Sequence, residues 1–215
     1  MVSPSTPSVL QNVSRETMVR LKIYQELLEM WQKKVNLISS ATQEVVWERH
    51  FEDSLQLLSY LPQKEASLID LGSGAGFPGL VLALARPETL KVTLIESDFK
   101  KALFLENVSR ETKCEVTILR TRIESLREKI KGDIITSRGL APLPQLLRYA
   151  HPFVKKDSIC LFLKGKNVHK EIQDSQKMWE FKLEIFPSIT DSEGKILKIT
   201  DLQRKYPHDE NHSGC

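Results

Sequence analysis

Residues 68–79 read LIDLGSGAGFPG, an apolar run followed by three alternating glycines and a proline. Residues 68–71 have the composition of a short buried strand, and residues 77–85 are almost all apolar, as in a packed helix. The glycines at 72, 74 and 76 can adopt positive φ and carry no Cβ, so the loop can turn tightly against another molecule. The stretch therefore predicts a strand, a loop and a helix that receive a nucleotide-like ligand, the alternative being a tight turn without a ligand.

Composition limits the class of protein. The chain has 215 residues and a hydrophobic content of 40%, which suits one nucleotide-binding domain plus an appendage. It has no apolar run near 18 residues and no basic-then-apolar start, so we expect a cytoplasmic protein without a membrane span. Its three cysteines have no CxxC spacing and no His at the distance of a metal ligand, and their odd number argues against a disulfide framework.

Basic residues are concentrated in one part of the chain. Residues 120–170 contain twelve Lys or Arg and four Asp or Glu, a net charge of +8, whereas the whole chain carries only +3. Such a distribution indicates a polyanionic partner. The alternative is a solvated surface that carries lysines.

Apolar periodicity divides the chain into four segments. Residues 1–13 are rich in Ser and Pro and are expected to be flexible. Residues 14–62 predict an N-terminal appendage of two helices, the second of which begins at Ser40 with a capping box and ends before Pro62. Residues 66–201 form the nucleotide-binding domain, and residues 202–215 are expected to be disordered.

Within the domain, apolar runs alternate with helical stretches. After residues 68–71, further strands are predicted at 92–95, 116–119, 133–136 and 158–163. Helices are predicted around 98–110, 123–131, 141–150 and 167–179. The alternation predicts an α/β fold, with a parallel sheet covered by helices on both faces, and residues 181–200 predict a closing antiparallel hairpin.

Two nucleotide cofactors fit a glycine loop in such a sheet. Residues 74–79 formally match the dinucleotide fingerprint G-x-G-x-x-G, but that fingerprint normally starts at the strand end, where this chain has Asp70-Leu71-Gly72. Read from the strand, the match is D-x-G-x-G-x-G, which resembles motif I of the class I (Rossmann-like) S-adenosylmethionine-dependent methyltransferases. Glu96 follows the second strand, where its carboxylate can bind both ribose hydroxyls. After the third strand, Ile123 and Glu124 offer a backbone N–H and a carboxylate to the edge of adenine.

The absence of two known features limits which kind of atom can accept the methyl group. The chain lacks the Asn/Asp-Pro-Pro-aromatic motif of exocyclic amino methylation after the fourth strand, where residues 136–142 read TSRGLAP. Methylation of a pyrimidine carbon needs a thiolate, and Cys160 lies inside an apolar strand. A substrate nitrogen that already carries a lone pair needs neither this motif nor a thiolate. Its positioning in line with the methyl sulfonium would then be the main catalytic task.

Six stretches in order resemble one family. LIDLGSGAGFPGL, TRIESL, TSRGLAPL and FLKGK, together with the upstream YQELLEMWQKKVNLIS and ERHFEDSL, are similar to the bacterial 16S rRNA guanine-N(7) methyltransferases, the RsmG family also called GidB. The resemblance covers residues from about 18 to 200. It implies methyl transfer from S-adenosylmethionine to nitrogen 7 of a guanosine near the decoding centre. The implied partner is 16S rRNA or the small ribosomal subunit, without a metal or a membrane.

The resemblance also implies site residues. Arg138, at the end of the fourth strand, would orient the base beside the methionine part of the cofactor, with no general base assigned. The expected cofactor contacts are Gly72, Gly74, Gly76, Phe77, Glu96, Ile123, Glu124 and Arg138. The expected RNA contacts are Lys164, Asn36, His50 and Asp53. For His50 and Asp53, a polar cluster that packs the helix onto the loop is an equal alternative.

Other functions remain open at this point. They are methylation of another RNA site or of a protein, a nucleotide-sensing RNA-binding module without chemistry, and an NAD-dependent oxidoreductase. The chain also departs from the family pattern at Gln32, where Asn is usual, at Ile38-Ser39, and at Gly139, where Ala is common. These departures concern the mouth of the pocket, and neither the oligomeric state nor the assembly state of the RNA substrate follows from the sequence.

Overall fold

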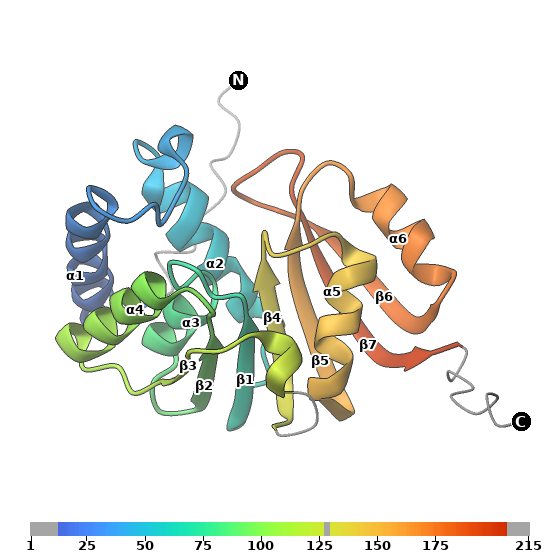
Figure 1. Ribbon diagram of the computed structural model, residues 1–215. Helices are drawn as coiled ribbons and strands as arrows, with labels where there is room; N and C mark the ends of the chain where they lie inside the picture. The colour runs from blue at the N-terminus through green and yellow to red at the C-terminus, as the bar shows by residue number, and fades with distance from the viewer. Residues whose placement is uncertain (1–12, 127–129, 206–215) are drawn as a thin grey trace, which may run out of the picture.

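A seven-stranded sheet with strand order β3-β2-β1-β4-β5-β7-β6 forms the centre of the molecule (Figure 1). The computed structural model describes residues 13–126 and 130–205. The strands are β1 Ala66–Leu71, β2 Leu90–Ile95, β3 Thr117–Leu119, β4 Gly132–Arg138, β5 Val154–Lys164, β6 Trp179–Pro187 and β7 Lys195–Arg204. β1 to β5 are parallel, and β7 lies antiparallel between β5 and β6. The predicted class I sheet with a closing hairpin is therefore confirmed.

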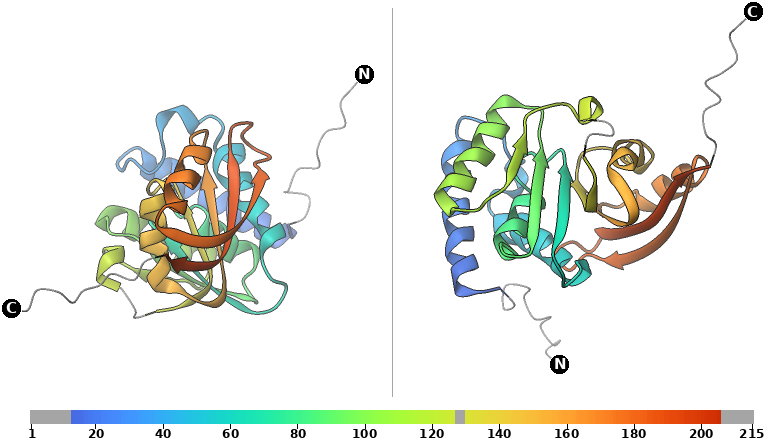
Figure 2. Two further views of the ribbon diagram at one scale, coloured as in Figure 1. Left: turned by 90° about the vertical axis from the view of Figure 1, so that its right-hand side faces the viewer. Right: turned by 90° about the horizontal axis from the view of Figure 1, so that it is seen from below.

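Helices cover both faces of the sheet (Figure 2). They are α1 Arg15–Gln32, α2 Asp53–Leu55, α3 Gly79–Ala85, α4 Phe99–Thr112, α5 Leu143–Ala150 and α6 Val168–Gln176. Side chains of successive strand residues point to opposite faces, so Leu68 and Ile69 of β1 belong to different hydrophobic clusters. One cluster packs α1, α3 and α4 against the sheet, and the other packs α5 and α6. β1 is consequently buried almost throughout its length.

The order of the strands locates the ligand crevice. β1 has β2 on one side and β4 on the other, so the crossovers leave the centre of the sheet in opposite directions. In open α/β sheets, ligands bind outside the carboxyl ends of the strands at such a switch point. The glycine loop after β1 begins at this edge.

Two predicted helices differ from those in the structure. The second helix of the appendage is not continuous from Ser40: a 3₁₀ turn at Ser40–Thr42 is followed by π-helical turns at Trp47–Glu52, then by α2 and a 3₁₀ segment at Gln56–Tyr60. The segment predicted as a helix over 123–131 forms only a 3₁₀ turn at Ile123–Leu126, and residues 127–129 lie outside the described part.

The last strand ends slightly later than the predicted boundary of the domain. β7 continues to Arg204, past the expected end of the domain at residue 201. Residues 1–12 and 206–215, which include most of the expected flexible start and most of the expected disordered tail, lie outside the described residues. None of the described helices is long and apolar enough to cross a membrane.

Candidate active site

The glycine loop is held in place by the appendage. Gly76 has φ of 95°, and a Cβ there would collide with the Tyr24 hydroxyl of α1. That hydroxyl donates a hydrogen bond to the carbonyl of Ala75, and the Tyr24 ring stacks on Phe77 with a centroid distance of 5.4 Å. The close approach of α1 thus requires glycine at position 76. In the sequence, Tyr24 is only one apolar position of an amphipathic helix, so this role was missed.

Asp70 supports the loop from below. It is fully buried, and its Oδ1 accepts a hydrogen bond from Thr136 Oγ1 at 2.7 Å. Burial raises the pKa of Asp70 to about 6, although the hydrogen bond from Thr136 acts in the opposite direction. Ser73 Oγ donates to the Asp70 carbonyl at 3.2 Å. The acidic residue of the motif therefore joins the loop to β4 beneath the ligand crevice.

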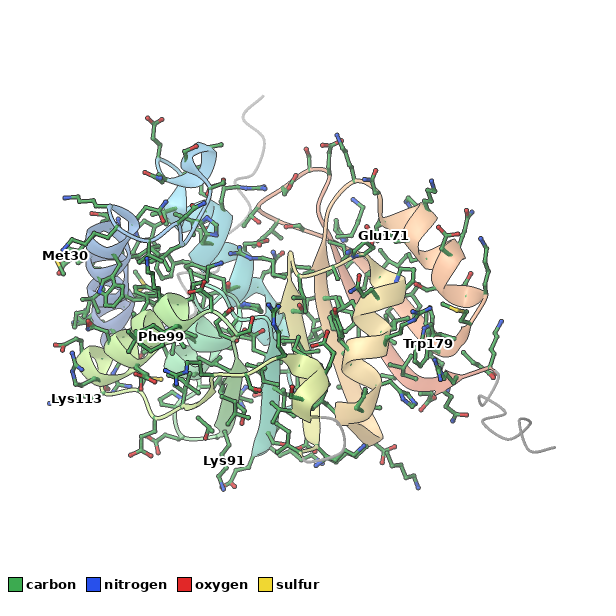
Figure 3. The ribbon with its side chains drawn as sticks, viewed as in Figure 1. Met30, Lys91, Phe99, Lys113, Glu171 and Trp179 are labelled. Atoms are coloured by element: carbon green, nitrogen blue, oxygen red, sulfur yellow. The ribbon has the colours of Figure 1, made fainter. Side chains whose placement is uncertain are left out.

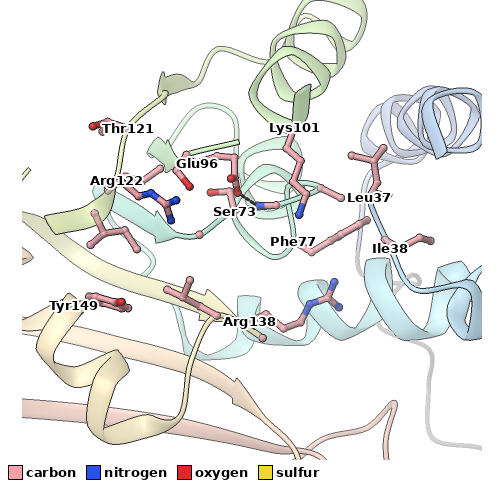
Figure 4. A pocket seen from close by; sticks show the side chains of 18 of the residues that line it. Leu37, Ile38, Ser73, Phe77, Glu96, Lys101, Thr121, Arg122, Arg138 and Tyr149 are labelled. Carbon is pink, nitrogen blue, oxygen red and sulfur yellow. Dashed lines mark hydrogen bonds between the residues drawn. The ribbon is translucent and has the colours of Figure 1, made fainter. Parts of the chain in front are cut away.

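A cavity of about 410 Å³ opens above the loop, at the carboxyl ends of β1, β2 and β4 (Figure 4). Seven of the eight expected cofactor residues line it, namely Gly72, Gly74, Phe77, Glu96, Ile123, Glu124 and Arg138. Gly76 is the exception, because it faces Tyr24. Sequence reasoning missed Lys101, Arg122 and Tyr149, which also line the cavity and whose residue types alone do not separate them from ordinary surface side chains.

Glu96 occupies the position expected of a ribose-binding carboxylate. It is buried, its Oε2 accepts a hydrogen bond from the Gly74 N–H at 2.8 Å, and its Oε1 accepts one from the Asp98 N–H at 2.7 Å. A carboxylate has about four lone-pair sites, so two remain for a ligand. The two backbone bonds hold the carboxylate beside the glycine loop.

Arg138 lines this cavity and bonds to the appendage. Nη1 donates to the Arg49 carbonyl at 2.8 Å and to Asp53 Oδ2 at 3.1 Å, and Nη2 donates to His50 Nδ1 at 2.6 Å. Its guanidinium carbon lies 5.0 Å from the centroid of the Phe77 ring. These contacts use three of the five N–H donors of the side chain and leave two.

The π-helical turns explain one of these bonds. The Asp53 N–H donates to the carbonyls of Glu48 and His50. In an α-helix it would donate to the carbonyl of Arg49 instead. The wider turn therefore leaves the Arg49 carbonyl available to the guanidinium of Arg138. This exchange depends on a residue far along the chain, so the periodicity of the segment could not reveal it.

Asp53 joins three parts of the chain. Its Oδ1 accepts hydrogen bonds from Gln56 Nε2 and Thr190 Oγ1, each at 2.8 Å, while its Oδ2 faces Arg138. Arg49 forms an ion pair with Asp191 at 2.8 Å beside it. The connection between β6 and β7 is thereby attached to the appendage, a contact that the sequence did not indicate.

His50 is held as a neutral ring. Its Nδ1 faces the Arg138 guanidinium, which is a donor only, so Nε2 carries the proton and donates to Thr42 Oγ1 at 2.9 Å. Burial lowers the pKa of His50 to about 3, and the charges of Arg138 and Arg49 act in the same direction. The ring also stacks on Phe77. A histidine held in this way cannot serve as a general base near neutral pH.

Lys164 is bonded within the protein, whereas Asn36 is exposed. Lys164 Nζ donates to the Ala141 carbonyl at 3.0 Å and pairs with Glu171 at 2.7 Å. Glu171, labelled in Figure 3, extends from α6, and its Oε2 also accepts the Leu143 N–H at 2.8 Å. Lys164 thus anchors the loop after β4, which lines the cofactor cavity. Asn36 is exposed and does not line this cavity.

Gln32, which stands where asparagine is usual, bonds to the backbone of Leu37 and Ile38. Its Oε1 accepts the N–H groups of Leu37 and Ile38 at 2.9 and 3.0 Å, and its Nε2 donates to the Ile38 carbonyl at 2.9 Å. Leu37 and Ile38 line the cavity. The departure from the family pattern therefore shapes the cavity mouth.

Metal-ligating side chains and cysteines are arranged as follows among residues 13–126 and 130–205. These residues contain no group of three or more His, Cys, Asp or Glu placed to hold a metal ion. Cys160 is buried in β5, and burial raises the pKa of its thiol to about 12. It packs in the core as predicted.

Comparisons with known proteins agree with this geometry. Residues 17–200 match the family GidB, described as rRNA small subunit methyltransferase G. The ribosomal RNA small subunit methyltransferase G of Gluconobacter oxydans (strain 621H) is 44% identical over 195 residues, which cover 91% of this chain and 99% of the relative. That of Rhodospirillum centenum (strain ATCC 51521 / SW) is 45% identical over 191 residues, which cover 88% and 87%.

Solved structures share the fold at low sequence identity. The ribosomal protein L11 methylase of Lactobacillus delbrueckii subsp. bulgaricus has a TM-score of 0.58 at 13% identity, over 74% of this chain and 79% of that chain. Fibrillarin of Aeropyrum pernix, solved with S-adenosyl-L-methionine bound, has a TM-score of 0.51 at 15% identity, over 65% and 69%. The fold is that of the class I methyltransferases, and the sequence relatives make the assignment specific: the chain belongs to the rRNA small subunit methyltransferase G family, GidB.

Proposed function

We propose that the protein transfers the methyl group of S-adenosylmethionine to nitrogen 7 of a guanosine in 16S rRNA. The match of residues 17–200 to the GidB family carries this proposal. The cavity at the carboxyl edge of the sheet supports it, because it is bordered by a glycine loop and a buried carboxylate. Within this proposal, residues 14–62 form the appendage, residues 66–201 form the methyltransferase domain, and the enzyme acts in the cytoplasm.

Different residues along the cavity would contact the ribose, the adenine and the methionine part of the cofactor. Glu96 has two lone-pair sites left for ribose hydroxyls, next to the backbone of Gly74. Ile123 and Glu124 would bind the adenine at the other end of the cavity. The two unused N–H donors of Arg138 would bind the methionine carboxylate or the entering base. When bound, S-adenosylmethionine supplies an electrophilic methyl group.

Orientation is the catalytic task that the residues of this chain support. Nitrogen 7 of guanine is an unprotonated acceptor at neutral pH, so the reaction requires no proton transfer at that atom. Neutral His50, with both ring nitrogens engaged, agrees with a mechanism that has no general base. Arg138, fixed by Asp53, His50 and Phe77, would instead hold the substrate in line.

RNA binding would involve exposed cations around the cavity. Residues 120–170 carry the net charge of +8, and Arg122 of this segment lies exposed at the cavity together with the half-buried Lys101. Because the ammonium of Lys164 already bonds to the Ala141 carbonyl and to Glu171, we assign Lys164 to anchoring of the loop rather than to RNA contact. We likewise assign His50 and Asp53 to the positioning of Arg138. The RNA partner is 16S rRNA, either free or within the small subunit.

The experiment is to map N(7)-methylguanosine in 16S rRNA from cells that lack the gene. Complementation with the wild-type gene should restore the modification, and complementation with the Gly74→Val variant should not. Free 16S rRNA and purified small subunits, tested in vitro, then identify the preferred substrate. Restored methylation of another RNA or of a protein, with unmodified 16S rRNA, would contradict the proposed function.

A further inference from the structure

A second cavity adjoins the cofactor cavity. Its volume is about 550 Å³, within the range of small-molecule sites. The two cavities share Leu37, His50, Arg138 and Gly139, so they meet at the Arg138 side chain. The rest of the second cavity is formed by the appendage, the end of β5 and the connection between β6 and β7.

The charges that line the second cavity are largely paired with each other or with near neighbours. Arg49 pairs with Asp191 at 2.8 Å, Arg138 with Asp53 at 3.1 Å, and Lys164 with Glu171 at 2.7 Å. Such a wall does not favour an anion, but it offers hydrogen bonds to a neutral polar group. Lys195 is the lining cation for which the described residues provide no ion-pair partner. The cavity therefore suits a neutral heterocycle whose attached phosphate lies near Lys195.

Gly165 leaves space that the protein itself does not use. It follows β5 and lines the second cavity, and a Cβ built on it would meet no atom within 4 Å. Its φ lies outside the left-handed region, so its backbone does not require glycine. Gly76, by contrast, has a packed neighbour and a positive φ. The absence of a side chain at 165 is thus unexplained by contacts within the described chain.

We propose that the second cavity binds the guanine base that is methylated, rotated out of its RNA stack, and that Gly165 leaves room for it. This inference rests on the proposed function. With the base in this cavity, nitrogen 7 can face the cofactor cavity past Arg138. A bond forms between nitrogen 7 and the methyl carbon while the bond between that carbon and sulfur breaks. The electron pair of the broken bond stays on sulfur, and no proton moves. Enzymes that act on a base inside a folded nucleic acid use such an extruded position.

The first test compares Gly165→Leu with Gly165→Ala and with a control, Asn167→Leu. Asn167 is exposed and uncharged, and it lines neither cavity. The leucine at 165 should lower the single-turnover methylation rate by at least about 100-fold, and alanine should lower it less. Affinity for S-adenosylmethionine by calorimetry and the urea midpoint should stay at wild-type values in all three. A Gly165→Leu variant that is folded and methylates at the wild-type rate would overturn the inference.

A second test does not depend on which RNA is the substrate. Guanosine 5′-monophosphate is titrated into the full-length protein saturated with S-adenosylhomocysteine, and amide shifts are followed by NMR. The nucleotide should shift the amides of Gly165 and of the 188–195 connection in the wild type, and should leave those of the 188–195 connection unshifted in Gly165→Leu. Shifts confined to the cofactor cavity would overturn the inference. If 16S rRNA is unmodified but these amides shift, the proposed RNA target fails while the base site stands.

Discussion

Replacing Asp53 with Asn tests whether the appendage holds the Arg138 guanidinium in position. The carboxylate accepts from Arg138 on one oxygen and from Gln56 and Thr190 on the other. An amide of the same shape has only one acceptor oxygen. Whichever way it turns, its NH₂ group faces an N–H donor of Arg138 or of Gln56. At least one charge-assisted contact is therefore lost without any change in volume.

The size of the effect follows from burial. Hydrogen bonds to charged groups contribute about 1.5–3 kcal/mol, and removing one partner of a fully buried ion pair costs about 3–5 kcal/mol. The side chains of Arg138 and Asp53 are 20% and 15% exposed, and Arg138 keeps its bonds to His50 and to the Arg49 carbonyl. We therefore expect Asp53→Asn to lower the free energy of unfolding by about 2–3 kcal/mol.

Urea unfolding at pH 7.5 measures this change, which should appear as a lower midpoint with an unchanged m-value. A double-mutant cycle with Arg138→Met should return a coupling of at least about 1 kcal/mol. The control is Asp174→Asn, because Asp174 pairs with Lys177 on the exposed surface of α6 and its loss should leave the midpoint nearly unchanged. A loss below about 0.5 kcal/mol, additive with Arg138→Met, would show that the carboxylate does not hold the guanidinium.

Four other outcomes follow from the site. Gly74→Val should abolish S-adenosylmethionine binding in calorimetry, because φ of 57° is strained for a β-branched residue and the side chain would enter the cavity; a folded variant with near-normal affinity would refute the loop assignment. Arg138→Ala should lower the single-turnover rate by about 10² or more with a smaller loss of RNA affinity, and an unchanged rate would remove it from the site. The logarithm of RNA affinity should fall with the logarithm of salt concentration by roughly 0.7 to 0.9 per phosphate contact, whereas a flat dependence would make residues 120–170 a solvated surface. Unfolded His50 binds a proton below its ordinary pKa of 6.5, whereas folded His50 stays neutral until about pH 3. The stability linked to His50 is therefore fully present above pH 6.5 and is lost as the pH falls toward 3. Urea unfolding of His50→Gln should therefore show a smaller decline over that window than the wild type, by up to about 1.4 kcal/mol per pH unit, and an equal decline would contradict the neutral buried ring.

Local features of the sequence were sufficient for the sheet and for the cofactor edge. Alternating apolar runs and helical periods depend on neighbouring residues, so they predicted β1 to β5, the closing hairpin and the loop over residues 72–76. In a parallel sheet the carboxyl ends of the strands meet at one edge. For this reason Glu96, Ile123 and Arg138, each near a strand end, could be expected together before any contact was known, and they do line one cavity.

Tertiary structure alone decided how the polar side chains pair. Arg138 lies 85 residues from Asp53, and Thr190 lies 137 residues from it, so no pattern along the chain connects them. The helix predicted from Ser40 has its regular turns only later in the segment, and within them the Arg49 carbonyl bonds to the distant guanidinium of Arg138 at a π-helical turn that no local pattern could predict. Lys164 illustrates the general reason: its sequence position fits a phosphate contact, but an ammonium that is largely buried needs partners within the protein, and Glu171 of α6 and the Ala141 carbonyl supply them. Residue type and spacing thus determined which groups reach the edge of the sheet, and packing decided which of them remain available to a ligand.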